Sequence, residues 1–309
     1  MLSLSATVLL VISLTAAVTF YISNSLFAKK ISKTSADYYV YMIIQGVVCA
    51  AVAVVSSGGI SGVSLYSVIF GIIFGITVAV QLLLNLKALA IGPFSYTSVL
   101  VSLSTVIPTL SGLFWGERID AMQIIGILLM VVCIILSTDR NADDSGKKIT
   151  AKWLVCCLGS SVTNGLMGVM QKMHQTSIHK DESAVFLCVT MVTLALFACV
   201  TLLLVKINNK KSDDSKIYLK FKPSHILIPV MAGVALGLCH VINLNLSGRL
   251  DAAVLFPIVN ICPLVLTTVA ATVLFNERLS KLRWMGIAIG ILSTLFVSGV
   301  MSSVIEKIF

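Results

Sequence analysis

Ten strongly apolar stretches, each about as long as a membrane-spanning helix, follow one another along the chain. They cover approximately residues 5–27, 37–56, 65–88, 94–115, 120–137, 153–174, 183–205, 225–248, 252–275 and 284–302. A helix needs roughly 20 mostly apolar residues to cross the hydrocarbon core of a bilayer. Most connections are short, and only residues 137–152 and 206–224 form longer polar segments. The pattern predicts an all-α integral membrane protein with ten transmembrane helices.

The composition excludes several classes of soluble protein. Hydrophobic residues make up 58% of the chain and charged residues 11%, whereas a soluble domain carries about 25% charged residues. This balance excludes a water-soluble enzyme, a nucleic-acid binder and a disordered scaffold. The stretch at 5–27 has no basic segment before it and is longer than a signal-peptide core. We therefore interpret it as a first transmembrane helix and not as a signal peptide. The eight cysteines all lie in apolar stretches without a Cys-x-x-Cys pair, so we predict no disulfide, no metal site and no cofactor.

A repeat links the two halves of the chain. The matching positions, 160 residues apart, are Glu117-Arg118 and Glu277-Arg278, Gly126 and Gly286, and Asn85-Leu86 and Asn245-Leu246. We therefore predict two five-helix repeats, at residues 1–150 and 151–309, around a central cavity. Because five is odd, the second repeat would cross the membrane in the opposite sense. Such inverted repeats are common in secondary transporters, which bind substrate near mid-membrane at the repeat interface.

The residues that carry this repeat also resemble a known family. The stretch from Ala88 through Pro108 to Glu117-Arg118 and Gly126 is similar to the EamA-type repeat of the drug/metabolite transporter superfamily, and Glu277-Arg278 with Gly286 resembles its second copy. The resemblance implies a transporter whose first, third, fourth, sixth, eighth and ninth helices surround the cavity, with the fifth and tenth at the periphery. The second copy departs from the pattern, because Thr268 stands where the first copy has Pro108.

The distribution of basic residues predicts an orientation. With ten helices, 17 of the 22 lysines and arginines lie in the connections on one side of the membrane and the other five lie on the side of the termini. The positive-inside rule places the richer side in the cytoplasm and both termini outside. We expect a multi-pass protein of the plasma (cell) membrane.

Neutral polar residues recur at helical spacing in the stretches that the resemblance places around the cavity. The predicted substrate-binding residues are Gln81, Asn85, Asn164, Gln171, His240, Asn243 and Asn260. The predicted cavity-lining residues are Thr19, Ser98, Ser102, Thr105, Ser161 and Thr267. No Asp or Glu lies deep in a stretch, which disfavours export of cations by exchange against protons at an acidic residue.

The same residues fit a second interpretation, in which they hold helices together. Small and hydroxyl residues also line helix–helix contacts in membranes. Asn85 and Asn245 occupy equivalent repeat positions, yet Asn245 lies about 140° around its helix from His240. These two residues cannot both face the cavity centre, so one of them serves packing. Lys87, Lys172 and Arg249, at the ends of their stretches, either extend to the headgroups or form a basic entrance that attracts anions.

The sequence thus predicts a secondary active transporter and not an enzyme. The substrate would be a small polar metabolite, namely an amino acid, a zwitterion or a weak organic anion, moved by alternating access, and the resemblance implies export. The alternative is an exchanger of phosphorylated or nucleotide-linked sugars, and a more remote one is a membrane enzyme or sensor. The expected partners are the substrate, a coupling ion (proton or sodium), the lipid bilayer and a second copy in a homodimer, but no nucleic acid.

Overall fold

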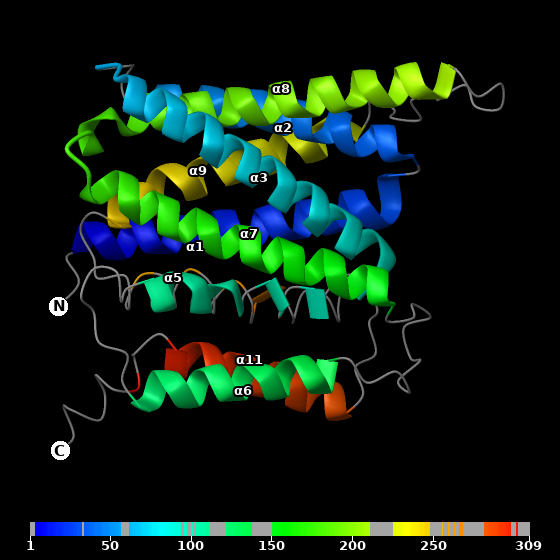
Figure 1. Cartoon of the computed structure of the whole chain (residues 1–309), viewed down its shortest axis with the longest axis vertical. Helices are drawn as coiled ribbons and strands as arrows, with labels where there is room; N and C mark the ends of the chain where they lie inside the picture. Colours follow the sequence, from blue (N-terminus) through cyan, green and yellow to red (C-terminus); the bar gives the residue numbers. More distant parts are fainter. Residues whose placement is uncertain are drawn as a thin grey trace. The chain divides into compact units, whose positions relative to one another are not determined.

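The computed structural model describes residues 4–32, 34–56, 62–93, 96–97, 100–101, 103–111, 121–137, 150–210, 225–247 and 281–297, and single positions at 255, 259, 263, 266, 267 and 301. Every regular element among these residues is a helix (Figure 1). Their bounds are α1 Leu4–Leu26, η1 Phe27–Ile31, α2 Ser35–Ser56, α3 Leu65–Ile91, η2 Leu103–Thr105, α5 Val106–Ser111, α6 Ala121–Ser137, α7 Ala151–Thr176, η4 Lys180–Glu182, α8 Ser183–Lys210, α9 Leu227–Ser247 and α11 Lys281–Val297.

The predicted helices and the observed ones agree closely where both can be compared. The stretches at 5–27, 37–56 and 65–88 correspond to α1, α2 and α3, and the remaining long helices match in the same way. The stretch at 94–115 is described only in part, as η2 and α5, and most of 252–275 lies outside the described residues. Among the described residues, six helices are long and apolar enough to cross a membrane. The all-α membrane class is therefore confirmed, whereas the ten-helix inverted repeat stays a prediction.

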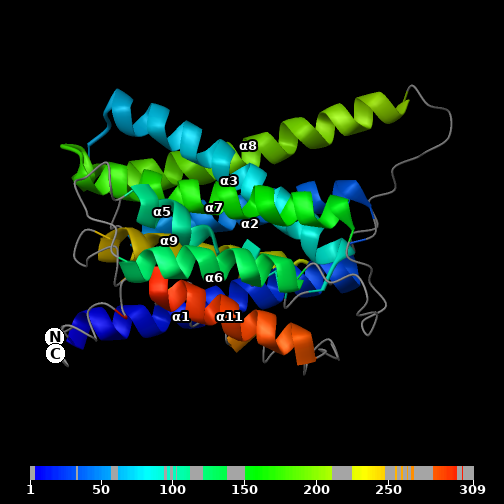
Figure 2. The ribbon, with the colours of Figure 1, turned by 60° about the horizontal axis from the view of Figure 1, so that its bottom comes forward.

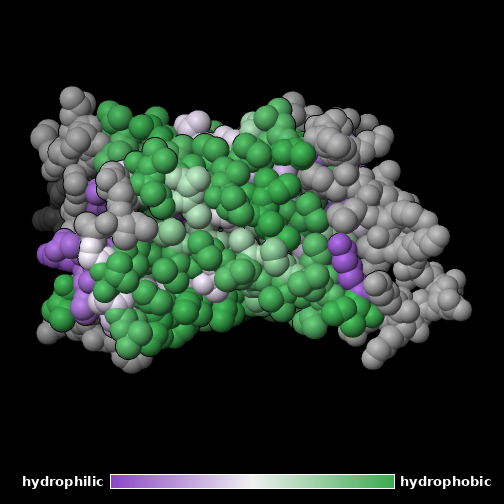
Figure 3. Space-filling view, turned by 90° about the horizontal axis from the view of Figure 1, so that it is seen from above, coloured by the Kyte–Doolittle hydropathy of each residue, from purple (hydrophilic) through white to green (hydrophobic). Residues whose placement is uncertain are grey.

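Large apolar side chains cover the outside of these helices. Leu128 of α6, Leu196 of α8 and Val155 of α7 are examples of strongly exposed aliphatic residues, and the described surface in Figure 3 is mostly hydrophobic. Monomeric soluble proteins rarely expose contiguous apolar areas of this kind. Exposed leucine, isoleucine and valine are instead what hydrocarbon chains solvate, so these faces are suited to lipid.

The chain divides into two compact units that are not its sequence halves. Unit 1 contains residues 1–86 and 173–245, and unit 2 contains residues 87–172 and 246–309. Each unit contains helices from both halves of the sequence. The units are defined by contacts within the fold, whereas the predicted repeats are defined by matching sequence positions. The division into repeats at 1–150 and 151–309 stays a prediction.

Unit 1 is held together by close approaches between helices. α2 packs along α8, and α3 meets α8 at Gly75, where an added Cβ would lie 2.6 Å from the carbonyl oxygen of Thr190 and 2.7 Å from the Cβ of Thr193. Glycine is required at this contact because any side chain would overlap the neighbouring helix. The hydrophobic effect does not drive association between helices in lipid. Close van der Waals packing at small residues such as Gly75 stabilises it instead.

Unit 2 contains the pair α6 and α11, which lie side by side (Figures 1 and 2). The Ser293 hydroxyl of α11 donates a 2.7 Å hydrogen bond to the carbonyl oxygen of Gly126 in α6. At the start of α7, the fully buried Trp153 donates from Nε1 to Thr97 Oγ1 at 3.1 Å. Because the indole ring lies against Gly92, an added Cβ there would approach Trp153 Nε1 to 2.1 Å.

We expect Gly75→Ala to lower the thermal midpoint of unfolding in detergent more than Gly46→Ala does. Both glycines face α8, but the nearest atom to an added Cβ at Gly46 is 3.1 Å away, at the oxygen of Met191, against 2.6 Å at Gly75. Overpacking of this kind costs about 1–3 kcal/mol, while alanine gains up to about 1 kcal/mol of helix propensity at either position. Equal midpoints for the two variants would show that α3 and α8 are not this close.

Candidate functional site

In unit 1 the predicted site residues lie on α1, α3 and α9. Gln81 and Asn85 are one turn apart on α3 and both are buried. Asn85 Oδ1 is buried without a hydrogen-bond partner. His240 of α9 is buried beside α3, with its ring edge-on to Phe74 at 6.0 Å between centroids. The structure therefore brings α3 and α9 into contact at His240 and Phe74, and the substrate-binding roles of Gln81, Asn85 and His240 stay a prediction.

Asn243 of α9 makes a contact between helices in this conformation. Its Oδ1 accepts a 2.7 Å hydrogen bond from the Ser13 hydroxyl of α1, and one turn earlier the Cys239 thiol lies 3.5 Å from the Ser13 carbonyl oxygen. This is the tie between helices that the packing interpretation expects. Its role in substrate binding stays a prediction.

In unit 2 the predicted residues of α7 meet the segment at 103–107. Asn164 Nδ2 donates a 2.7 Å hydrogen bond to Ser104 Oγ, and the neighbouring Gly165 packs so closely that an added Cβ would lie 2.6 Å from Ile107. Ser161 and Gln171 are buried on the same helix. The predicted polar face of α7 is therefore an inward face of unit 2.

Two further predicted residues are buried in unit 2, and three lie outside the described residues. Thr105 is buried in η2, and the buried Thr267 donates to the carbonyl oxygen of Pro263 in its own helix at 2.7 Å. Such a bond occupies the hydroxyl and leaves the methyl group to face a neighbour. Asn260, Ser98 and Ser102 lie outside the described residues.

A groove between α1 and α9 has a volume of about 500 Å³. Its lining residues are Val11, Ile12, Thr15, Ala16, Thr19, Val230, Met231, Val234, Ala235 and Leu238. Thr19, predicted to line the cavity, is one of its two hydroxyl residues. Both threonines donate to backbone oxygens one turn earlier, at 2.9 Å each, so the wall is almost entirely apolar. Ligand sites of this size usually combine such walls with a few polar groups.

The sequence analysis missed two buried amides. Gln45, in the middle of α2, has an exposed fraction of 0%, and neither of its amide atoms has a hydrogen-bond partner. Asn24 of α1 is also fully buried; its Oδ1 accepts from the Tyr41 hydroxyl at 2.6 Å, while its Nδ2 has no partner. Tyr41 and Gln45 are one turn apart and share a face of α2. The signal available in the sequence was a lone glutamine inside an apolar stretch.

These orphaned atoms are energetically significant. A buried donor or acceptor without a partner costs about 1–3 kcal/mol, and the hydrocarbon core supplies no water to compensate. α1 then passes into the π-helix η1 at Phe27, three residues after Asn24, and π-helical turns are frequent at functional sites. The amides of Gln45, Asn24 and Asn85 are therefore among the described polar groups of unit 1 that a ligand could still satisfy.

Metal binding receives no support from the described part of the chain. Among these residues, no group of three or more histidine, cysteine, aspartate or glutamate side chains could hold a metal ion. The described cysteines are unpaired with one another.

Residues 151–299 match the model of the EamA-like transporter family. These residues belong to that family. The resemblance drawn from Glu277-Arg278 and Gly286 is thereby confirmed, and the match covers α7, α8, α9 and α11. The family is one of membrane transporters of the drug/metabolite type, which agrees with the apolar spans of the described helices.

The fold of the chain also resembles that of a protein of known crystal structure. The two share a TM-score of 0.64 at 14% sequence identity, with 96% of this chain and 98% of the other covered. At this identity the likeness shows a common fold along nearly the whole length and nothing about substrate. Among curated proteins, none matches the chain.

We expect Gln45→Leu and Gln81→Leu to change stability in opposite directions. Leucine at 45 removes two buried, unpartnered amide atoms, so the thermal midpoint should rise, by the equivalent of about 1 kcal/mol or more. Gln81 is comparably buried, with an exposed fraction of 7%, but it has an interaction partner. The same substitution there should lower the midpoint. A fall for Gln45→Leu would mean that this amide is satisfied in the folded protein.

Proposed function

We propose that this protein is a secondary active transporter that moves a small polar metabolite, namely an amino acid, another zwitterion or a weak organic anion. Transport would proceed by alternating access of two inverted repeats, and in the direction of export. The observation that carries the proposal is the set of buried neutral amides in apolar spans, of which Gln45, Asn24 and Asn85 retain unpartnered polar atoms.

The chemistry of these atoms favours a substrate that both donates and accepts hydrogen bonds. The Asn85 Oδ1 atom can accept, Asn24 Nδ2 can donate, and the Gln45 amide can do both. A zwitterion offers ammonium donors and carboxylate acceptors together. The apolar groove of about 500 Å³ between α1 and α9 would suit its side chain or carbon body.

The charge distribution argues against the sugar-phosphate alternative. Phosphate groups are normally held by arginine or lysine side chains. Every lysine whose burial the structure describes is at least partly exposed, including Lys87 and Lys172 at the helix ends. A phosphate ester would therefore enter this protein without a buried cationic partner among those residues.

The test is a thermal-shift and counterflow experiment on the purified protein. Amino acids, organic acids, sugar phosphates and cationic dyes are added to the detergent-solubilised protein, because a ligand that binds only the folded state raises the midpoint. Compounds that stabilise are then examined for exchange into proteoliposomes loaded with the same compound. Exchange of an amino acid or weak organic acid supports the proposal, and exchange of phosphate esters alone would replace it with the sugar-phosphate exchanger.

With the substrate found in this way, we expect Asn85→Ala to reduce counterflow at least about tenfold, since one lost hydrogen bond is worth about 1.4 kcal/mol. Its thermal midpoint without substrate should change little, because Asn85 Oδ1 has no partner to lose. Thr201→Val serves as control, since this α8 hydroxyl bonds only to the Phe197 carbonyl oxygen of its own helix. Wild-type flux in Asn85→Ala would remove Asn85 from the substrate site.

A further inference from the structure

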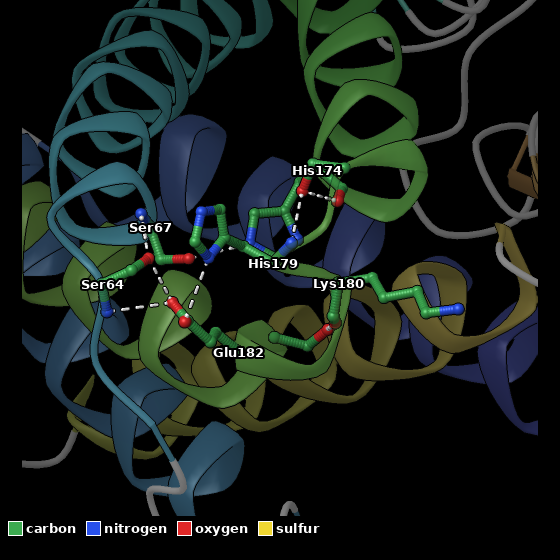
Figure 4. Close-up of polar contacts among 8 residues, drawn as sticks. Ser64, Ser67, His174, His179, Lys180 and Glu182 are labelled. Atoms are coloured by element: carbon green, nitrogen blue, oxygen red, sulfur yellow. Dashed lines mark hydrogen bonds and ion pairs between the residues drawn. The ribbon is translucent and has the colours of Figure 1, made fainter.

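A hydrogen-bonded cluster of titratable and hydroxyl side chains lies at one end of unit 1 (Figure 4). It joins Ser64 and Ser67 at the start of α3 to His174 in the last turn of α7 and to His179 and Glu182 in the turn that leads into α8. None of these residues belongs to the predicted substrate site.

The Glu182 carboxylate is the centre of the cluster. Its Oε2 accepts from the Ser64 backbone N–H at 3.0 Å and from the Ser64 hydroxyl, and its Oε1 lies 3.2 Å from His179 Nδ1. Ser67 N–H donates to Ser64 Oγ at 3.2 Å. Gly62 has a φ of 72°, a conformation that a residue with a side chain rarely adopts. This conformation sets the direction in which the chain approaches Glu182.

The cluster reaches from the surface to a fully buried imidazole. The side chains of His179 and Glu182 are 28% and 17% exposed, whereas His174 is 0% exposed. His174 Nε2 lies 3.4 Å from Ser67 Oγ, and its Nδ1 is buried without a partner. The ring stacks on Phe186 of α8 at 4.3 Å between centroids.

This packing accommodates only the neutral form of His174. A protonated imidazole carries two N–H donors and needs two acceptors, but the site offers one, the Ser67 hydroxyl. Tyr66, Phe70 and Phe186 surround the ring with aromatic carbon. A proton on Nδ1 would thus be a buried charge with an unsatisfied donor, and the last turn of α7 would have to move to solvate it.

The other charged groups near the ring do not relieve this penalty in the packed state. From the turn before α8, the Glu182 carboxylate is occupied by Ser64 and His179. Asp181 is exposed, and Lys180 points away from the cluster in Figure 4. On α7 itself, Lys172 is partly exposed half a turn earlier. From α3 the ring meets only Ser67 and the two aromatic residues.

The position of His174 along α7 connects it to the predicted substrate residues. α7 belongs to unit 2 as far as Lys172 and to unit 1 from Met173 onward. His174 therefore fixes the end of this helix in unit 1. Upstream on the same continuous helix lie Gln171 and Asn164. A displacement of the last turn would be transmitted along α7, because a helix is stiff.

We propose that His174 is the binding site of the coupling ion and that this ion is a proton, taken up from the aqueous end that His179 and Glu182 border. The proton adds to Nδ1 of the neutral ring and stabilises a conformation in which the last turn of α7 has left its contact with Ser67 and Phe186. A ligand shifts such an equilibrium by its difference in affinity for the two states. Here the packed state has almost no affinity for a proton at His174. The coupling role rests on the transport function proposed above, whereas the proton-dependent release does not need a substrate.

The release is tested first, without substrate, by hydrogen–deuterium exchange of the full-length protein in nanodiscs at pH 7.5, 6.5 and 5.5. After correction for the intrinsic pH dependence, exchange in residues 62–70 and 173–183 should rise by up to about tenfold per pH unit, the limit for one proton. His174→Gln should abolish this dependence, and His225→Gln, a matched histidine at the start of α9, should retain it. Ser67→Ala removes the one hydrogen bond to the neutral ring and should move the release to higher pH. A pH-independent wild type, or an acid response that survives in His174→Gln, would overturn the proposal.

The coupling is then measured as uptake into proteoliposomes with and without an imposed pH gradient. The wild-type flux should be driven by the gradient, and His174→Gln should keep counterflow at equal pH while losing the response to the gradient. Gradient-driven flux in His174→Gln would contradict the assignment. If exchange shows the release but no panel compound is transported, the proposed function fails and the proton site stands. If transport is found but the exchange is insensitive to pH, the proton site fails alone.

Discussion

Because the hydrocarbon core contains no water, every polar group in the membrane-spanning segments must find its partner within the protein. The long helices satisfy the backbone, and hydroxyl side chains within them mostly donate to a carbonyl oxygen one turn earlier, as Thr15, Thr77 and Thr201 do. Longer polar side chains bridge helices, as Asn164 does to Ser104 and Asn243 to Ser13. Close helix contacts at glycines such as Gly75 bring these groups within reach of one another. The architecture of each unit follows from this one requirement.

The same requirement makes the exceptions informative. Gln45 and Asn85 each leave at least one buried amide atom without a partner, and His174 leaves Nδ1 in the same state. A membrane protein retains such atoms at a free-energy cost, which is offset when a ligand satisfies them. The first two suit a neutral polar substrate and the third suits a proton. Substrate and ion would therefore be recognised by the same kind of incompletely satisfied site.

Much of the fold, and less of the site, could be predicted from the sequence. Apolar length alone located the helices, since twenty apolar residues admit few other structures in lipid. Two residues of the polar stripes, Asn85 on α3 and Gln171 on α7, are buried, while their role in substrate binding stays a prediction. Periodicity could not separate a residue that pairs across helices, such as Asn243, from one that remains unpartnered, because that depends on the neighbouring helix.

Other features depended on contacts between distant parts of the chain. Ser64 and Glu182 are 118 residues apart and meet only in the folded unit, so no local pattern marked this cluster. Gln45 lies in a stretch without a polar stripe, so helical spacing does not mark it. Asn85 and Asn245, which the predicted repeat treats as equivalent, have different surroundings, since the former is buried and the latter exposed. A sequence repeat does not enforce equal environments when the partner helices differ.

The boundary between the two compact units falls within three unbroken helices. α3 crosses it after Leu86, α7 after Lys172 and α9 after Asn245. Each crossing lies within two residues of a predicted substrate residue, respectively Asn85, Gln171 and Asn243. At these three points the chain passes from one unit to the other as regular helix, held by backbone hydrogen bonds from one turn to the next, and not as a loop.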